Sequence, residues 1–81
     1  MDKKTFDMAF GFNVMRFRRI RGYTQEALGK KIGVSKNTIS LWEGGLRHPD
    51  IVTIINLASA LSVSAADLIR CHEKEGEGDA T

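Results

Sequence analysis

The spacing of apolar residues along the chain predicts helices. One apolar stripe recurs at intervals of four, four and three residues, at Phe6, Phe10, Val14 and Phe17. This spacing places the four side chains on one face of a helix. No segment alternates between apolar and polar residues in the way that a half-buried strand does. The pattern therefore predicts a first helix over about residues 7–21.

Capping residues and stop residues mark four further helices. A side-chain oxygen that can accept a backbone hydrogen bond precedes each of them, at Thr24, Ser35, Asp50 and Ser64. Glycines or a proline interrupt the chain between them. The predicted helices are Gln25–Ile32, Lys36 to about Glu43 or Gly44, about Ile51–Leu61, and a short last helix through Ala65, Ala66, Leu68 and Ile69.

Five short helices joined by short turns predict an all-α fold, a compact bundle with one core. We expect residues 1–8 to form a flexible N-terminal arm, residues 9–70 the folded domain, and residues 71–81 a disordered acidic tail that contains glycine. A domain of this size is only just large enough for one core, so a partner subunit would help. The predicted core is Phe10, Val14, Phe17, Leu28, Ile32, Val34, Ile39, Trp42, Ile51, Ile54, Leu57, Ala58, Leu61, Val63 and Leu68.

Charge is distributed unevenly, although the net charge is only +2. Residues 1–50 carry ten Lys or Arg against five acids, and residues 51–81 carry two against five. The basic half could therefore contact a polyanion, while the acidic half should face elsewhere. A solvated surface would explain the same charges.

Composition excludes several classes of protein. No apolar run reaches 18 residues and no cleavable leader is present, so we expect a soluble, cytoplasmic protein without a membrane partner. Cys71, His72 and His48 are too few and wrongly spaced for a zinc site, and we interpret them as ordinary surface or partly buried side chains. We expect no metal, no cofactor and no enzymatic activity, because no nucleophile and base or paired carboxylates cluster along the chain.

The second and third predicted helices form the informative unit. Leu28, Ile39 and Trp42 fall where two helices crossing at about 90 to 120° must touch. Gly29 falls where their backbones come closest, which accounts for a residue that otherwise costs about 1 kcal/mol inside a helix. A helix pair that merely packs would explain these positions, but it would not explain the outward face.

The outward face of the third helix is polar. At about 100° per residue, Lys36, Ser40, Asn37 and Leu41 fall on one side, and Thr38, Trp42 and Ile39 fall on the other. Ammonium and amide groups can read base edges in the major groove, and an exposed leucine can contact a thymine methyl group. A solvated face would explain the polar residues equally well, but it would not explain the leucine.

The segment YTQEALGKKIGVSKNTISLWEGGLRHP, residues 23–49, closely resembles the helix-turn-helix of the phage-repressor class, also called the Cro/C1 or XRE family. The resemblance covers about residues 9–70 and implies a lambda-repressor-like fold, in which the second and third helices are the helix-turn-helix. Its matching positions are Arg18, Gly22, Thr24, Gln25, Leu28, Gly29, Gly33, Val34, Ser35, Ile39, Ser40, Glu43, Gly45, Arg47, Pro49, Ile54, Leu57, Ala58, Leu61, Val63 and Leu68.

The resemblance implies roles for individual residues. Arg18 would pair with Glu43, and Gln25 would bind a phosphate while bracing the recognition helix. Thr38 is the weakest phosphate candidate, because it points toward the core. The base-reading candidates are Lys36, Asn37, Ser40 and Leu41, and the phosphate-binding candidates are Gln25, Ser35, Thr38 and Arg47.

The implied function is sequence-specific binding of double-stranded DNA by a bacterial or phage-encoded transcriptional repressor. We expect a homodimer that reads a palindromic operator through its third helices, with half-sites about 34 Å apart. The last helix, with Val63, Ala66 and Ile69, is the predicted dimer interface. No small-molecule effector is implied.

Several alternatives remain at this point. A lysogeny repressor, a restriction-modification controller and an antitoxin autorepressor could all have this size. A protein-interaction module without DNA binding is a further alternative, because Phe12, Met15, Val52 and Ile55 widen the apolar faces of two helices. Leu46, in the loop after the third helix, could lie against a second subunit or a phosphate.

Overall fold

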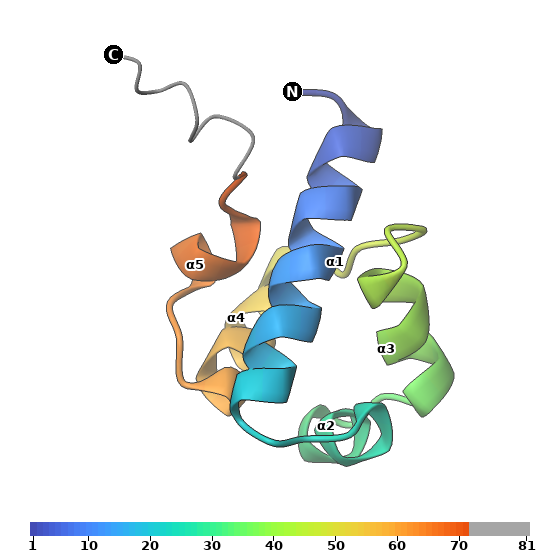
Figure 1. The fold of residues 1–81 in the computed structure, drawn as a ribbon, viewed down its shortest axis with the longest axis vertical. Helices are drawn as coiled ribbons and strands as arrows, with labels where there is room; N and C mark the ends of the chain where they lie inside the picture. The colour runs from blue at the N-terminus through green and yellow to red at the C-terminus, as the bar shows by residue number, and fades with distance from the viewer. Residues whose placement is uncertain (72–81) are drawn as a thin grey trace.

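Five helices make up the fold in the computed structural model, which describes residues 1–71. They are α1 (Lys3–Ile20), α2 (Gln25–Ile32), α3 (Lys36–Glu43), α4 (Ile51–Leu61) and α5 (Ala65–Ile69). α1 runs through the middle of the molecule, with α4 and α5 on one side, α3 on the other and α2 across its lower end (Figure 1). No strand occurs in the described range, so the predicted all-α fold is confirmed.

The predicted capping residues begin the last four helices. Thr24, Ser35, Asp50 and Ser64 each accept a hydrogen bond from the backbone N–H three residues later, at 2.9 to 3.1 Å. At α5 the bond is reciprocal, because Asp67 accepts from the Ser64 N–H at 3.0 Å. Capping of this kind satisfies backbone donors that have no partner within the helix, so it fixes where each helix starts.

The first helix begins earlier than predicted. Residues 3–8, expected to belong to a flexible arm, form the first turns of α1, and Asp2 caps the helix by accepting from the Thr5 N–H at 2.8 Å. Phe6 stacks on Phe10 with ring centroids 6.0 Å apart, so the apolar stripe holds these turns against the rest of the domain. Of the predicted tail, residues 72–81 lie outside the described residues.

Of the fifteen predicted core residues, ten are buried, four are partly buried and one is exposed. Phe17, Ile32, Val34 and Val63 are partly buried at the edge of the core rather than within it. Ile51 was predicted to be buried, but 62% of its surface is exposed, because it lies to one side of the helix face that Ile54, Leu57, Ala58 and Leu61 bury. The buried residues are Phe10, Val14, Leu28, Ile39, Trp42, Ile54, Leu57, Ala58, Leu61 and Leu68.

Two glycines allow the helix backbones to meet. A Cβ atom on Gly29 would lie 2.5 Å from the carbonyl oxygen of Val34, so α2 packs directly on the start of α3, as the sequence predicts. A Cβ atom on Gly11 would lie 2.2 Å from the carbonyl oxygen of Trp42, so α1 packs as closely on the end of α3. These distances are too short for a side chain, and α3 is therefore positioned from both ends.

In the range 1–71, no helix is both long enough and apolar enough to cross a membrane.

Candidate DNA-binding interface

α3 has one buried face and one polar face. Ile39 is fully buried and Trp42 nearly so, and these two side chains anchor the helix to the core. Lys36, Asn37 and Ser40 are exposed. Three of the four predicted base-reading residues therefore lie together on the outer surface of one short helix.

Leu41 is the fourth predicted base-reading residue, and it is only partly exposed. Its carbonyl oxygen accepts the Leu46 N–H at 3.1 Å as the chain leaves the helix. Leu46 is itself strongly exposed. Apolar surface is thus available at the end of α3, but Leu41 offers less of it than the helical wheel indicates.

Ser35 and Thr38 both take part in the start of α3. The Ser35 Oγ atom accepts the Thr38 N–H at 3.0 Å, and the two hydroxyl oxygens lie 3.0 Å apart. Ser35 is exposed and Thr38 is half-buried. Their first role is to cap the helix, and the exposed hydroxyl of Ser35 is the better placed of the two for a contact outside the protein.

A buried ion pair connects α1 to the end of α3. Arg18 donates to both carboxylate oxygens of Glu43, from Nε at 2.6 Å and from a terminal guanidinium nitrogen at 3.0 Å. The two side chains are 11% and 6% exposed. Arg18 also donates to the Tyr23 carbonyl at 2.8 Å, and Gln25 donates to Glu43 at 3.0 Å. A two-pronged pair of this kind fixes orientation as well as distance, so α1, α2 and α3 are held in one arrangement.

A second charged cluster lies at the other end of α1. The carboxylate of Asp7 is buried and accepts from Lys3 Nζ at 3.1 Å and from His48 Nδ1. The His48 ring also meets Phe6 edge-on, with centroids 5.3 Å apart. Burial by itself raises the pKa of Asp7, but the hydrogen bonds from Lys3 and His48 outweigh it and lower that pKa below its ordinary value.

This second cluster was not predicted from the sequence. His48 was interpreted as an ordinary side chain, and Asp7 was assigned to the predicted arm. The two residues are 41 positions apart, and His48 stands between the motif positions Arg47 and Pro49 without being one of them. The only available signal was an acidic residue beside the apolar stripe of the first helix.

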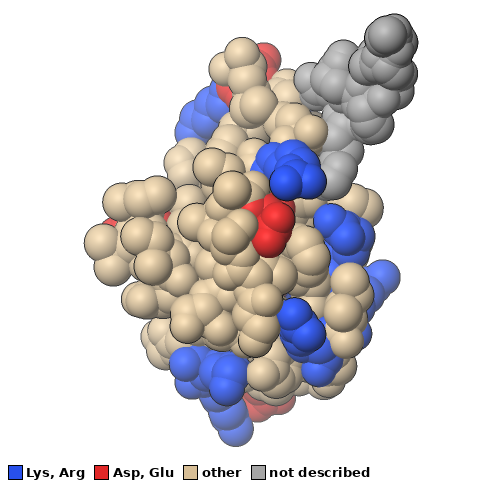
Figure 2. Space-filling view, turned by 90° about the vertical axis from the view of Figure 1, so that its left-hand side faces the viewer, with Lys and Arg blue, Asp and Glu red and all other residues tan. Residues whose placement is uncertain are grey.

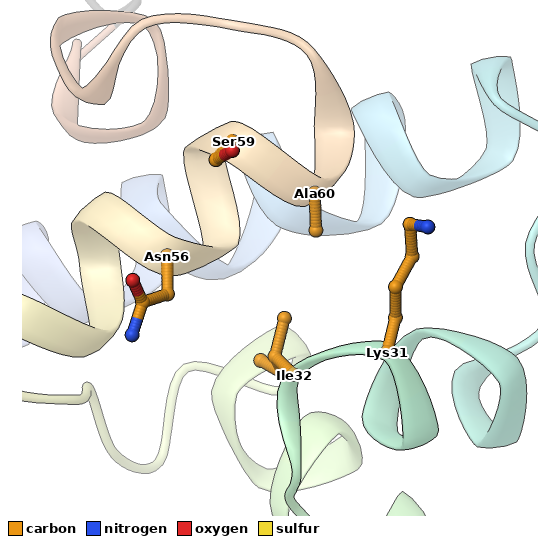
Figure 3. A pocket seen from close by; sticks show the side chains of 5 residues that line it. All are labelled: Lys31, Ile32, Asn56, Ser59 and Ala60. Atoms are coloured by element: carbon orange, nitrogen blue, oxygen red, sulfur yellow. The ribbon is translucent and has the colours of Figure 1, made fainter.

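The loop between α3 and α4 lies over this cluster. Lys3, Leu46, Arg47 and His48 line a hollow of about 350 Å³, and Arg47 is exposed. A larger hollow of about 450 Å³ lies between α2 and α4, where Lys31, Ile32, Asn56, Ser59 and Ala60 line it (Figure 3). The larger hollow has one cation, one amide and one hydroxyl, a set that contains no acid and base pair.

The face on the α4 and α5 side of the molecule carries few charges. Figure 2 shows this side of the molecule, where most of the surface is uncharged and most of the Lys and Arg side chains lie toward its edges. Ile51, Val52 and Ile55 of α4 are exposed. Of the predicted dimer-interface residues, Val63 is half-buried, and Ala66 and Ile69 are exposed.

Comparison with known proteins decides the class of this domain. Residues 14–68 match the helix-turn-helix family HTH_3. The chain belongs to this family. It is 41% identical over 59 residues to y4dJ, an uncharacterized HTH-type transcriptional regulator of Sinorhizobium fredii strain NGR234, covering 73% of this chain and 77% of that protein.

Solved structures of this family have the same fold. The restriction-modification controller protein C.AhdI from Aeromonas hydrophila superposes with a TM-score of 0.77 at 28% identity, covering 84% of this chain and 99% of that chain. The P22 c2 repressor, in complex with a synthetic operator, superposes with a TM-score of 0.72 at 33% identity, covering 75% and 92%. HTH_3 proteins of the XRE or Cro/C1 type are DNA-binding transcriptional regulators and not enzymes, and this chain is one of them.

Proposed function

We propose that this chain is a sequence-specific transcriptional repressor that places α3 in the major groove of double-stranded DNA. The observation that carries the proposal is the exposed face of Lys36, Asn37 and Ser40 on a helix whose other face is buried. A helix that reads bases must keep its orientation while its polar side chains stay free. The buried pair of Arg18 and Glu43 supplies that orientation.

Two sets of residues have separate roles in the proposal. The base-reading set is Lys36, Asn37, Ser40 and Leu41, and the phosphate-binding set is Gln25, Ser35, Thr38 and Arg47. Gln25 can serve in both bracing and binding, because its amide nitrogen has two hydrogens and only one is needed for Glu43. Phosphate contacts fix the register of the protein on the duplex, and contacts to base edges provide the specificity.

We further propose that the repressor acts as a homodimer on a palindromic operator, within the cytoplasm where such DNA lies. Two helices that read equivalent half-sites must be about 34 Å apart, and a two-fold dimer sets that spacing. The proposed interface is around Val63, Ala66 and Ile69, of which Ala66 and Ile69 are exposed. α5 lies on the side of the molecule shown in Figure 2, which is largely uncharged. The similarity to the P22 c2 repressor supports this mode of binding.

Selection of bound duplexes from a random DNA pool tests the proposal. We expect an inverted repeat whose half-sites are about one helical turn apart, together with a dimer mass in light scattering of the complex. An enriched single half-site would contradict the dimer, and salt-sensitive binding without enrichment would contradict sequence specificity. No binding even at low salt would contradict the function itself.

A further inference from the structure

The hollow between α2 and α4 combines polar groups with an apolar floor. Its volume of about 450 Å³ lies in the range of sites for small organic molecules, which often lie between the helices of a bundle. Ile32 and Ala60 are half-buried and point toward one another across it, while Lys31 rises from the end of α2 toward α4 (Figure 3). None of its described lining residues belongs to the proposed base-reading or phosphate-binding set.

The polar side chains of this hollow have no hydrogen-bonding partner within residues 1–71. Asn56 and Ser59 make no side-chain hydrogen bond there, and Lys31 forms no ion pair. The Lys31 ammonium lies over the face of the Tyr23 ring, 5.7 Å from its centroid. The preceding lysine, Lys30, points elsewhere and pairs with Glu26 on its own helix at 4.0 Å. Of the two neighbouring lysines, Lys31 is therefore the one whose charge is available to a bound group.

The charge and the donors of the hollow select a class of ligand. Lys31 supplies one positive charge, and no acidic side chain is among the described lining residues. The amide nitrogen of Asn56 and the hydroxyl of Ser59 supply neutral donors. One cation with two neutral donors matches a group that has one negative charge and two acceptor oxygens, which is a carboxylate. A phosphate dianion would bring a second charge without a partner beside an apolar floor, which is unfavourable.

We propose that this hollow binds a small aliphatic monocarboxylate. Lys31, Asn56 and Ser59 would hold the carboxylate, and Ile32 and Ala60 would contact the hydrocarbon part, whose burial adds to the affinity. The ligand would connect α2 to α4, because the lining comes from both helices. The inference goes beyond the proposed function and does not rest on it, since the site shares no residue with the proposed DNA contacts.

Titration of the isotope-labelled full chain with isovalerate tests the proposal. We expect saturable changes in the amide NMR signals of the lining residues at neutral pH, with a Kd of about 1 to 10 mM for a probe this small. Isovaleramide has the same shape without the charge and should bind at least about tenfold more weakly. Equal binding of the amide, tighter binding of inorganic phosphate, or no saturable change at the hollow would each overturn the proposal.

Lys31→Met removes the charge of the hollow and keeps an unbranched side chain. We expect this variant to lose at least about tenfold in affinity for isovalerate, because a hydrogen bond to a charged group is lost. Lys30→Met is the matched control, because it removes an equally exposed charge from the neighbouring position, and its affinity should stay within about twofold of the wild type. Equal losses in the two variants would show that isovalerate is attracted by the basic surface in general, and would overturn the site.

Unfolding supplies a second measurement of the same site. A ligand that binds only the folded chain raises the free energy of unfolding as its concentration passes the Kd. We expect isovalerate to raise the urea midpoint of the wild type and of Lys30→Met, but not of Lys31→Met, relative to sodium chloride at equal ionic strength. Equal midpoints in isovalerate and in chloride for the wild type would contradict binding to the folded protein.

Discussion

At the residue scale, Asn37 provides the sharpest test of base reading. Its side chain is exposed near the start of α3, and in the described part of the chain it makes no hydrogen bond. An asparagine amide can pair with an adenine through two hydrogen bonds. We expect Asn37→Ala to cost about 1 to 3 kcal/mol on the operator and to relax the preference at one or two positions. Affinities for the operator and for single-base variants of it measure this effect.

Gln25→Ala is the matched control for Asn37→Ala. Gln25 is half-buried and donates to Glu43, so its proposed contact is to the DNA backbone and not to a base. Its removal should weaken binding to the operator and to unrelated duplexes by about the same factor. An equal loss on both kinds of DNA for Asn37→Ala would contradict its base-reading role.

At the scale of elements, the buried ion pair holds α3 in place. Glu43→Ala leaves the Arg18 guanidinium nearly buried without its carboxylate partner. Loss of one partner of a buried pair typically costs about 3 to 5 kcal/mol, a large fraction of the roughly 5 to 15 kcal/mol that stabilises a small domain. We expect a loss of this size in the free energy of unfolding, measured by urea denaturation.

A double variant separates the lost pair from the stranded charge. In Arg18→Met with Glu43→Leu, both side chains remain large but neither is charged. Apolar replacements of a whole buried pair are often neutral for stability, so the double variant should be more stable than Glu43→Ala alone. If the double variant were as unstable as Glu43→Ala, the unpaired charge of Arg18 would not be the cause of the lost stability.

At the scale of the whole molecule, we expect the free energy of unfolding to fall at acidic pH. Backbone and side-chain hydrogen bonds at helix starts lower the pKa of Asp2, Asp50 and Asp67 below 3.8. Burial by itself raises the pKa of Asp7, but the hydrogen bonds from Lys3 and His48 lower it by more. A carboxyl group whose pKa is lowered by folding stabilises the folded state when it is ionised. This contribution to stability is complete above the ordinary pKa of the group, and it is lost as the pH falls through the pKa that the group has in the folded protein.

The expected result is a fall in the free energy of unfolding from about pH 5 downward, measured by urea denaturation at a series of pH values. Asp50→Asn is the control, because asparagine caps a helix as well as aspartate does but cannot titrate in this range. Its stability should fall less steeply than that of the wild type. Identical slopes would contradict a contribution from the α4 cap.

The sequence by itself determined the elements whose causes are local. Thr24, Ser35, Asp50 and Ser64 begin their helices at the predicted positions, because a cap bonds a backbone group only three residues away. The polar face of α3 also followed from periodicity. The pairing of Arg18 with Glu43 was implied by the family resemblance alone, since the two residues are 25 positions apart.

Only the tertiary structure decided which distant residues meet. Asn13 is fully buried in α1, where its amide nitrogen donates to the carbonyls of Leu68 and Arg70 at 2.9 and 2.8 Å. Those carbonyls belong to the far end of the chain, so no local pattern indicates that an asparagine is needed there. The meeting of Asp7 with His48 has the same origin. Capping and periodicity act over one or two helical turns, whereas the burial of a polar group depends on which segments pack around it.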